Sequence, residues 1–248
     1  MSTTSIAALS AKSGVYAEVA GKAALIAVFA VGGTRKVLAI TTLLHEWGAT
    51  DPATRWTYLT AQVCALAFIV LIIVTTFIRH RPLRSAEGLE PRLSALGGTF
   101  LAGTLGLLPP AEIPLSVTLI AVGMSAVGAI LSTCVLLWLG RSFSVMAQAR
   151  KLVTTGPYAI VRHPLYLSEE LMAVSLMLLF FSPLAVLIAI VHWGFQLRRM
   201  VNEERVLGAE YPEYASYAAT TPRVLPRLLP RLKARPVGNP RTSMGEGG

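Results

Sequence analysis

Two short motifs in the second half of the chain concentrate polar, aromatic and ionisable side chains beside apolar segments. The first runs from Thr155 to Tyr166, and the second runs from Arg199 to Glu204 about one helical hairpin later. Ionisable side chains at the ends of apolar helices in a membrane protein are functional candidates by default, because they are costly to keep there. We therefore expect a ligand site where these two motifs meet.

The first motif joins a turn to the start of a helix. Gly156-Pro157-Tyr158 predicts the turn, since glycine tolerates unusual backbone angles and proline restricts the next residue. Arg162-His163-Pro164 then precedes a helix that should begin near Leu165, which places a positive helix end beside His163 and Tyr166. This arrangement favours an anionic or zwitterionic ligand. The alternative is an anchor at the level of the lipid headgroups.

The second motif places Arg199 and Glu203 four residues apart, on one face of a helix. The two side chains can therefore hold two ligands, or they can form a surface ion pair of little energetic consequence. Arg198 and Glu204 point elsewhere on the same turn and are expected to be solvated.

Glu169 and Glu170 need a separate explanation, because they follow within the first turns of an apolar helix. Two interpretations stay open at this point. Either these carboxylates pair with Arg162 or Arg199, or they lie at the wet interface.

Composition indicates an integral membrane protein. The chain has 248 residues, 54% of them hydrophobic, with mean hydropathy +0.60, and its apolar runs reach the ~20 residues needed to cross hydrocarbon. The formal net charge of +9 is concentrated in the loop Arg79–Arg92 and in the C-terminal tail, which favours anionic lipid over nucleic acid as a partner. Cys64 and Cys134 lie in apolar runs, and no metal site is expected.

These features predict an all-α fold of about five to six transmembrane helices with a cytoplasmic C-terminal helix. The first apolar run, from Ala23 to Leu44, is interrupted by Arg35 and Lys36. The apolar stretch Leu165 to Phe195 is too long for one crossing and contains Ser182-Pro183, so it should form a tight hairpin. The other expected spans are Tyr58 to Ile78, the short Leu93 to Leu108, and Ile113 to Leu139.

Loop charges predict the orientation and the domain organisation. Segments Arg79–Arg92 and Gly140–Arg162 are basic, whereas the loop Pro109–Pro114 has no lysine or arginine, so the basic segments should face the cytoplasm. Val201 to Ala219 should leave the membrane and fold back over the cytoplasmic mouth. We expect N-terminal transmembrane helices over 1–139, a catalytic region with the hairpin over 140–227, and a disordered basic tail over 228–248.

The order of the motifs resembles the C-terminal half of the isoprenylcysteine carboxyl methyltransferase and phospholipid methyltransferase superfamily. The likeness covers roughly Gly140 to Arg227 and rests on these segments: Gly156-Pro-Tyr158, Arg162-His-Pro-Leu-Tyr166, the broken hairpin, Arg199-x-x-x-Glu203-Glu204, Glu210-Tyr211 with Tyr214, and Thr221-Pro-Arg-Val-Leu-Pro226. Two departures are Ser168, where the family often has glycine, and a short spacer before Tyr211, with Leu207 where phenylalanine is usual.

The resemblance implies a membrane-embedded methyltransferase that uses S-adenosylmethionine. It assigns donor binding to Lys151, Leu152, Val153, Tyr158, His163, Pro164, Leu165, Tyr166 and Glu203. Arg199 would orient a lipid-like or lipidated acceptor, so that Arg199 and Glu203 form the catalytic pair, with the active site and the C-terminus on the cytoplasmic side. Carboxyl O-methylation of an isoprenylcysteine-like group is expected first, with phospholipid amine N-methylation, an NADPH-dependent reductase of the steroid reductase type and a non-catalytic scaffold as alternatives.

Overall fold

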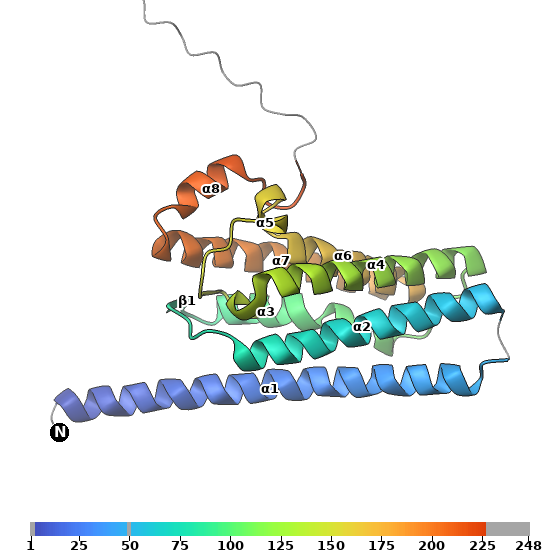
Figure 1. The fold of residues 1–248 in the computed structure, drawn as a ribbon, viewed down its shortest axis with the longest axis horizontal. Helices are drawn as coiled ribbons and strands as arrows, with labels where there is room; N and C mark the ends of the chain where they lie inside the picture. Colours follow the sequence, from blue (N-terminus) through green and yellow to red (C-terminus); the bar gives the residue numbers. More distant parts are fainter. Residues whose placement is uncertain (1–2, 49–50, 227–248) are drawn as a thin grey trace, which may run out of the picture.

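The structure is a computed structural model that describes residues 3–48 and 51–226, with side chains from residue 19 onward. Long helices run side by side along the length of the molecule (Figure 1). The elements are α1 (Thr3–His45), α2 (Pro52–Ile78), β1 (Arg84–Ser85), α3 (Glu90–Phe100), η1 (Ala102–Leu107), α4 (Leu115–Leu139), η2 (Gly140–Ser142), β2 (Gln148–Ala149), α5 (Pro157–Ile160), α6 (Pro164–Leu179), α7 (Pro183–Glu210) and α8 (Tyr214–Thr220).

Four helices in the described part of the chain are long and apolar enough to cross a membrane. They cover Val19–His45, Pro52–Ile78, Leu115–Ser142 and Pro183–Glu210. The all-α membrane fold is thus confirmed, but the expected count of five to six spans is not reached. The reason is length: α3 has 11 residues before it gives way to the 3-10 helix η1, and α6 has 16 residues, both short of the ~20 residues of a full crossing.

The predicted hairpin between α6 and α7 is confirmed, and local signals explain it. The Ser182 hydroxyl accepts a hydrogen bond from the backbone N–H of Ala185 at 3.1 Å, which caps the start of α7, and Pro183 takes the first helical position. The N-cap serine accepts a hydrogen bond from a free backbone N–H at the helix start. The proline that follows has no backbone N–H that would need a partner there. The chain therefore reverses in three residues.

Small residues allow α4 and α6 to pack closely, which positions the start of α6. The Ser132 hydroxyl of α4 donates to the Ser168 hydroxyl of α6 at 2.8 Å, and both side chains are buried. A Cβ on Gly128 would lie 3.0 Å from the Ser168 carbonyl oxygen. Ser168, the departure from the family pattern, therefore keeps a small side chain at this crossing. Its hydroxyl has a hydrogen-bond partner on the neighbouring helix, as polar side chains within a membrane require.

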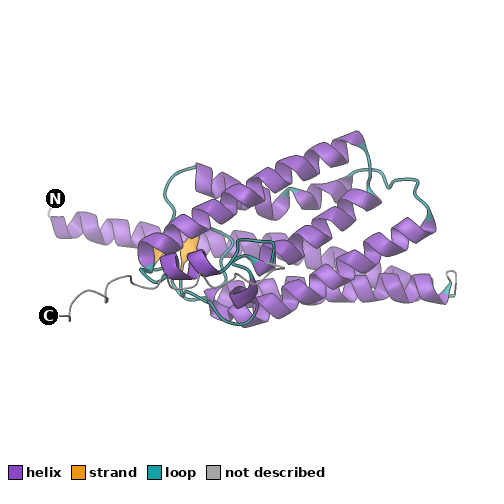
Figure 2. Ribbon diagram, turned by 90° about the horizontal axis from the view of Figure 1, so that it is seen from above, coloured by secondary structure: helices purple, strands orange, loops and turns teal. Residues whose placement is uncertain are grey.

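The end of α7 differs from the expectation. The prediction that Val201 to Ala219 folds back over the mouth was wrong for its first half, because α7 continues without a break to Glu210. Only α8 folds back across the end of the bundle, beside the short α5 (Figure 1). At the same end, β1 and β2 pair in an antiparallel two-stranded ribbon (Figure 2). Arg227 and the predicted tail 228–248 lie outside the described residues.

Candidate active site

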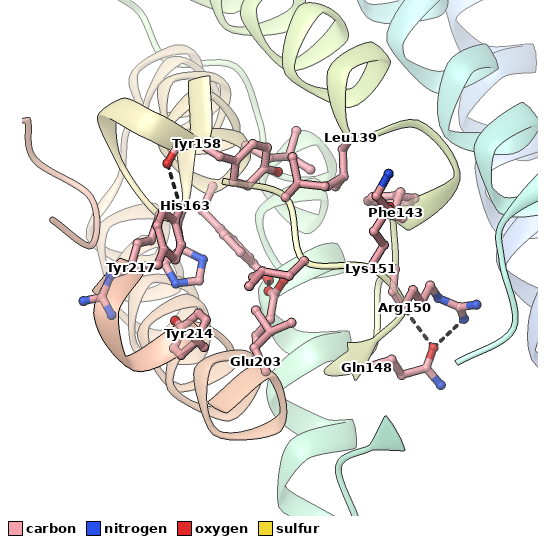
Figure 3. A pocket seen from close by; sticks show the side chains of 18 of the residues that line it. Leu139, Phe143, Gln148, Arg150, Lys151, Tyr158, His163, Glu203, Tyr214 and Tyr217 are labelled. Atoms are coloured by element: carbon pink, nitrogen blue, oxygen red, sulfur yellow. Dashed lines mark hydrogen bonds between the residues drawn. The ribbon is translucent and has the colours of Figure 1, made fainter. Parts of the chain in front are cut away.

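A pocket of about 720 Å³, counting the part open to solvent, lies at the end of the bundle covered by α5 and α8. Its wall comes from the end of α4, the segment that carries β2, the start of α6, the second half of α7, and α8. The labelled side chains from these elements surround one central space (Figure 3). Segments separated by up to about 80 residues in the chain therefore contribute to one site.

The residues predicted to bind the donor converge here. The pocket is lined by Lys151, Leu152, Val153, Tyr158, His163, Leu165, Tyr166, Glu203 and also Arg199. Pro164 is the exception, since it is buried at the first position of α6 and is not part of the lining. Its contribution is to start the helix that places its two neighbours.

The turn before α5 depends on Gly156. Its φ of +60° is a conformation that residues with a side chain rarely adopt. A Cβ at this position would also lie 2.3 Å from the indole of Trp138, at the end of α4. Glycine is therefore required twice, and the close approach of the backbone to Trp138 sets where Tyr158 enters the pocket.

Arg199, Tyr166 and Glu203 form a linked group within the pocket. The Arg199 guanidinium lies over the Tyr166 ring, 4.7 Å from its centroid, and the Tyr166 hydroxyl donates to Glu203 Oε2 at 2.7 Å. Arg199 is 4% exposed, which excludes the surface ion-pair interpretation of Arg199 and Glu203. The Nε of Arg199 is buried and has no hydrogen-bond partner among the described residues. This N–H group is thus a charged hydrogen-bond donor that a ligand can use.

Glu204 contradicts the prediction that it is solvated. Its side chain is 12% exposed and contacts three cationic or ionisable groups. Oε1 lies 3.0 Å from His163 Nε2 and 3.3 Å from Arg162 Nη1, while Arg223 binds both oxygens, at 2.9 and 2.6 Å. Arg162 and His163 line the pocket. Glu204, which does not itself line the pocket, therefore positions Arg162 and His163, which do.

The segment Thr221 to Pro226 is tied to the site by backbone hydrogen bonds. The backbone N–H of Arg162 donates to the carbonyl of Pro222 at 2.8 Å, and that of His163 donates to the carbonyl of Arg223 at 3.0 Å. Arg223 then reaches Glu204, whose carboxylate raises the pKa of its guanidinium. Backbone and side-chain contacts together fix the chain just before α6.

Two tyrosines of α8 close the pocket. The Tyr217 hydroxyl donates to the carbonyl of Tyr158 at 2.6 Å, and Tyr214 packs edge-on against the Tyr217 ring (Figure 3). Burial raises the pKa of Tyr217 to about 12, and burial also raises the pKa of Tyr158 and Tyr214. All three remain neutral at physiological pH and act as hydrogen-bonding and apolar walls.

Several lining residues were not predicted from the sequence. Among them are Gln148 and the buried Arg150, whose guanidinium donates to the Gln148 side chain at 2.6 Å, and Phe143. Tyr214 was part of a motif but had no assigned role, and Tyr217 was not singled out. The available signal was the position of Arg150 directly before Lys151, to which the family resemblance assigns donor binding.

The two acidic residues of α6 find different partners. Glu170 lies 3.0 Å from Nε2 of His192 in α7, a partner that the sequence did not suggest. Glu169 lies within electrostatic range of Arg199, but no ion pair joins the two among the described residues, so the expected pairing stays a prediction. Neither glutamate belongs to the pocket lining.

Comparison with known proteins gives a consistent result. Residues 121–209 match the isoprenylcysteine carboxyl methyltransferase (ICMT) family. The chain is 35% identical over 102 residues to protein-S-isoprenylcysteine O-methyltransferase B of Arabidopsis thaliana, covering 37% of this chain and 52% of that protein. It is 33% identical over 107 residues to protein-S-isoprenylcysteine O-methyltransferase A of the same plant, covering 39% and 54%.

A third relative has a different description. The nickel-cobalt-cadmium resistance protein NccN of Alcaligenes xylosoxydans xylosoxydans is 34% identical over 109 residues, covering 44% of this chain and 50% of that protein. The chain thus spans about half the length of the curated relatives it matches. The family match starts in α4, earlier than Gly140, and stops before Tyr211.

The matched segment contains most of the pocket, from Leu139 through Leu207, and leaves out the two tyrosines of α8. The motif order and the family match agree on the same helices. Residues 121–209 of this chain therefore match the isoprenylcysteine carboxyl methyltransferase family, the same family that the sequence motifs resemble.

Proposed function

We propose that this protein is a membrane-embedded, S-adenosylmethionine-dependent methyltransferase that methylates the carboxylate of a lipid-like, isoprenylcysteine-like acceptor. The observation that carries the proposal is the buried Arg199, whose Nε has no partner among the described residues, inside a pocket built from the ICMT-family segment. The named relatives favour methyl transfer over a nicotinamide reductase.

The residues of the pocket fit the donor. Arg150, Lys151 and Arg162 supply positive charge for its carboxylate, and the carboxylate of Glu203 can accept hydrogen bonds from its ammonium group or ribose hydroxyls. Tyr158 offers an aromatic surface near the cation. Tyr166 lines the same pocket, and it also links the two catalytic candidates, because its ring lies against Arg199 and its hydroxyl binds Glu203.

The bound donor would supply an activated sulfonium methyl group, so the protein must mainly align the two reactants and exclude water. Arg199 would hold the acceptor carboxylate by a charge-assisted contact, while Tyr166 keeps the guanidinium and Glu203 in register. One oxygen of the acceptor carboxylate held by Arg199 would take the methyl group, and the donor's sulfur would keep the electron pair of the broken carbon–sulfur bond. No proton has to move, so no general base is needed for a carboxylate acceptor, whereas an amine would need one.

The orientation proposal follows from charge. Basic groups surround the pocket end of the bundle, which favours the cytoplasmic side for the active site. The lipid-like part of the acceptor would then extend between helices into the bilayer while its carboxylate reaches Arg199.

A methyl-transfer assay on membranes, varying donor and acceptor separately, tests the proposal. Arg199→Ala should mainly impair acceptor use, and Glu203→Ala should mainly impair donor binding. Arg199→Lys should rescue poorly, because a point charge lacks the planar fork. A lost contact to a charged group is worth about 1.5 to 3 kcal/mol, hence roughly tenfold to more than a hundredfold in rate.

Donor binding is tested separately by calorimetric titration with S-adenosylhomocysteine. His163→Ala and Tyr158→Ala should weaken binding, whereas Arg198→Ala, in α7 and outside the pocket lining, should not. Unchanged donor affinity in both pocket variants would contradict the site. Full activity of Arg199→Ala would contradict a carboxylate acceptor held by this residue.

A further inference from the structure

A second hollow lies against α1 and the loop after α2, and the proposed methyl transfer does not use it. It holds about 1000 Å³, counting the part open to solvent, and its lining includes Leu25, Arg79, Arg92, Met146 and Gln148. We propose that this hollow, the α1 groove, binds the phosphate of an anionic phospholipid.

The charge of the groove favours an anion. Arg79 and Arg92 contribute two guanidinium groups, and none of the described residues that line the groove is acidic. Guanidinium groups bind phosphate oxygens in a forked, charge-assisted geometry. Two such groups, one directly after α2 and one in the first turn of α3, can hold one phosphate between them.

The position of the groove indicates that the anion belongs to a lipid. Arg79 directly follows α2, and Leu25 lies within one turn of Ala23, where the apolar run of α1 begins. The groove therefore spans the boundary between the ends of two membrane helices and the polar loop. A basic pocket between transmembrane helices at this level suits an anionic headgroup.

The surface of α1 leaves room for the acyl chains. Only 11% of the most apolar stretch of α1 is buried inside the protein. Val28 and Val31, one to two turns deeper than Leu25, are 51% and 64% exposed. Together with the apolar wall at Leu25 and Met146, this provides a path for hydrocarbon from the groove into the bilayer.

The α1 groove and the active-site pocket are separate but adjacent. Gln148 of β2 lines both hollows, accepts from Arg150 in the pocket and donates to the Ser85 hydroxyl of β1. The lipid site therefore does not overlap the acceptor position at Arg199, and it does not depend on the proposed methyl transfer.

The test is binding of a fluorescent phosphatidylglycerol to the purified full chain in a neutral detergent, measured by anisotropy. Phosphatidylglycerol should bind more tightly than the matched phosphatidylcholine. Because one basic residue near a lipid surface contributes about 1 kcal/mol, Arg92→Glu and Arg79→Gln should each weaken binding by about fivefold or more. Arg81→Glu is the matched control, since Arg81 is exposed in the same loop but does not line the groove.

The outcomes separate the sources of the anion. Competition by excess unlabelled phosphatidylglycerol but not by equal inorganic phosphate supports a lipid site; equal competition by phosphate overturns it in favour of a soluble anion. An equal loss in Arg81→Glu, or no loss in Arg92→Glu, also overturns the proposal. Thermal unfolding is followed for each variant, and if Arg79→Gln unfolds, Arg92→Glu decides, with Arg92→Lys expected to lose less binding than Arg92→Glu because it keeps the charge but not the fork.

Discussion

Replacing Glu204 by glutamine should weaken both the stability of the protein and the binding of the donor. The carboxylate contacts His163 at 3.0 Å, Arg162 at 3.3 Å and Arg223 at 2.6 Å, and these side chains are 4%, 15% and 43% exposed. Glutamine keeps the size of the side chain but removes its charge. The substitution therefore measures the electrostatic part of the cluster.

The expected magnitude follows from burial. The contact to Arg223 is partly exposed and screened, so it contributes about 0–1 kcal/mol. The contacts to His163 and Arg162 are more buried, and charge-assisted hydrogen bonds of this kind contribute about 1.5 to 3 kcal/mol. We expect a total loss of about 2–4 kcal/mol in the free energy of unfolding. Donor affinity should fall about tenfold, because two pocket residues lose their support.

Thermal unfolding in detergent and calorimetric titration with S-adenosylhomocysteine measure the two effects. Glu90→Gln is the matched control, since Glu90 also binds an arginine, Arg198, at 2.7 Å, but both side chains are about half exposed. That pair should contribute only about 0.2–1 kcal/mol. If Glu204→Gln changed stability and donor affinity no more than the control does, Glu204 would not support the pocket.

Three further predictions concern the turn, the covering helix and the topology. Gly156→Ala should lower stability by about 1–3 kcal/mol and impair donor binding, because of its positive φ and the 2.3 Å approach to Trp138, whereas Gly103→Ala, with no atom within 4 Å of its Cβ, should be tolerated in the same unfolding assay. Because the pKa of Tyr217 is raised to about 12 by burial, folding holds its proton more tightly, so stability should be fully present below about pH 10 and should fall as the pH rises from about 10 to 12. Tyr217→Phe should make that fall less steep, since Tyr158 and Tyr214 still contribute to it, and an unchanged profile would contradict the assignment. In a chain whose native cysteines are replaced by serine, single cysteines at Arg81 and Glu112 should be labelled from opposite sides of the membrane; labelling from one side would refute the proposed topology.

Much of the architecture was predictable from local patterns. Long apolar runs require membrane helices, since they cannot be covered by so short a chain, and Ser182-Pro183 marks the reversal between α6 and α7 through capping chemistry confined to a few residues. The convergence of Tyr158, His163 and Glu203 in one pocket was also predictable, because the order of the motifs resembles that of a known family. The span count was not predictable, because hydropathy alone does not distinguish the short helices α3 and α6 from full crossings.

The roles within the site were decided by tertiary structure. Glu203 and Glu204 are neighbours in sequence, but successive helical residues point about 100° apart, so each side chain meets a different part of the fold. Glu203 meets Tyr166 of α6, and Glu204 meets Arg223 from a segment that returns past the end of the bundle. Arg150 and Gln148 entered the pocket for the same reason, since β2 lies against α7. Sequence periodicity tells which residues share a helix face, but only packing decides what that face touches.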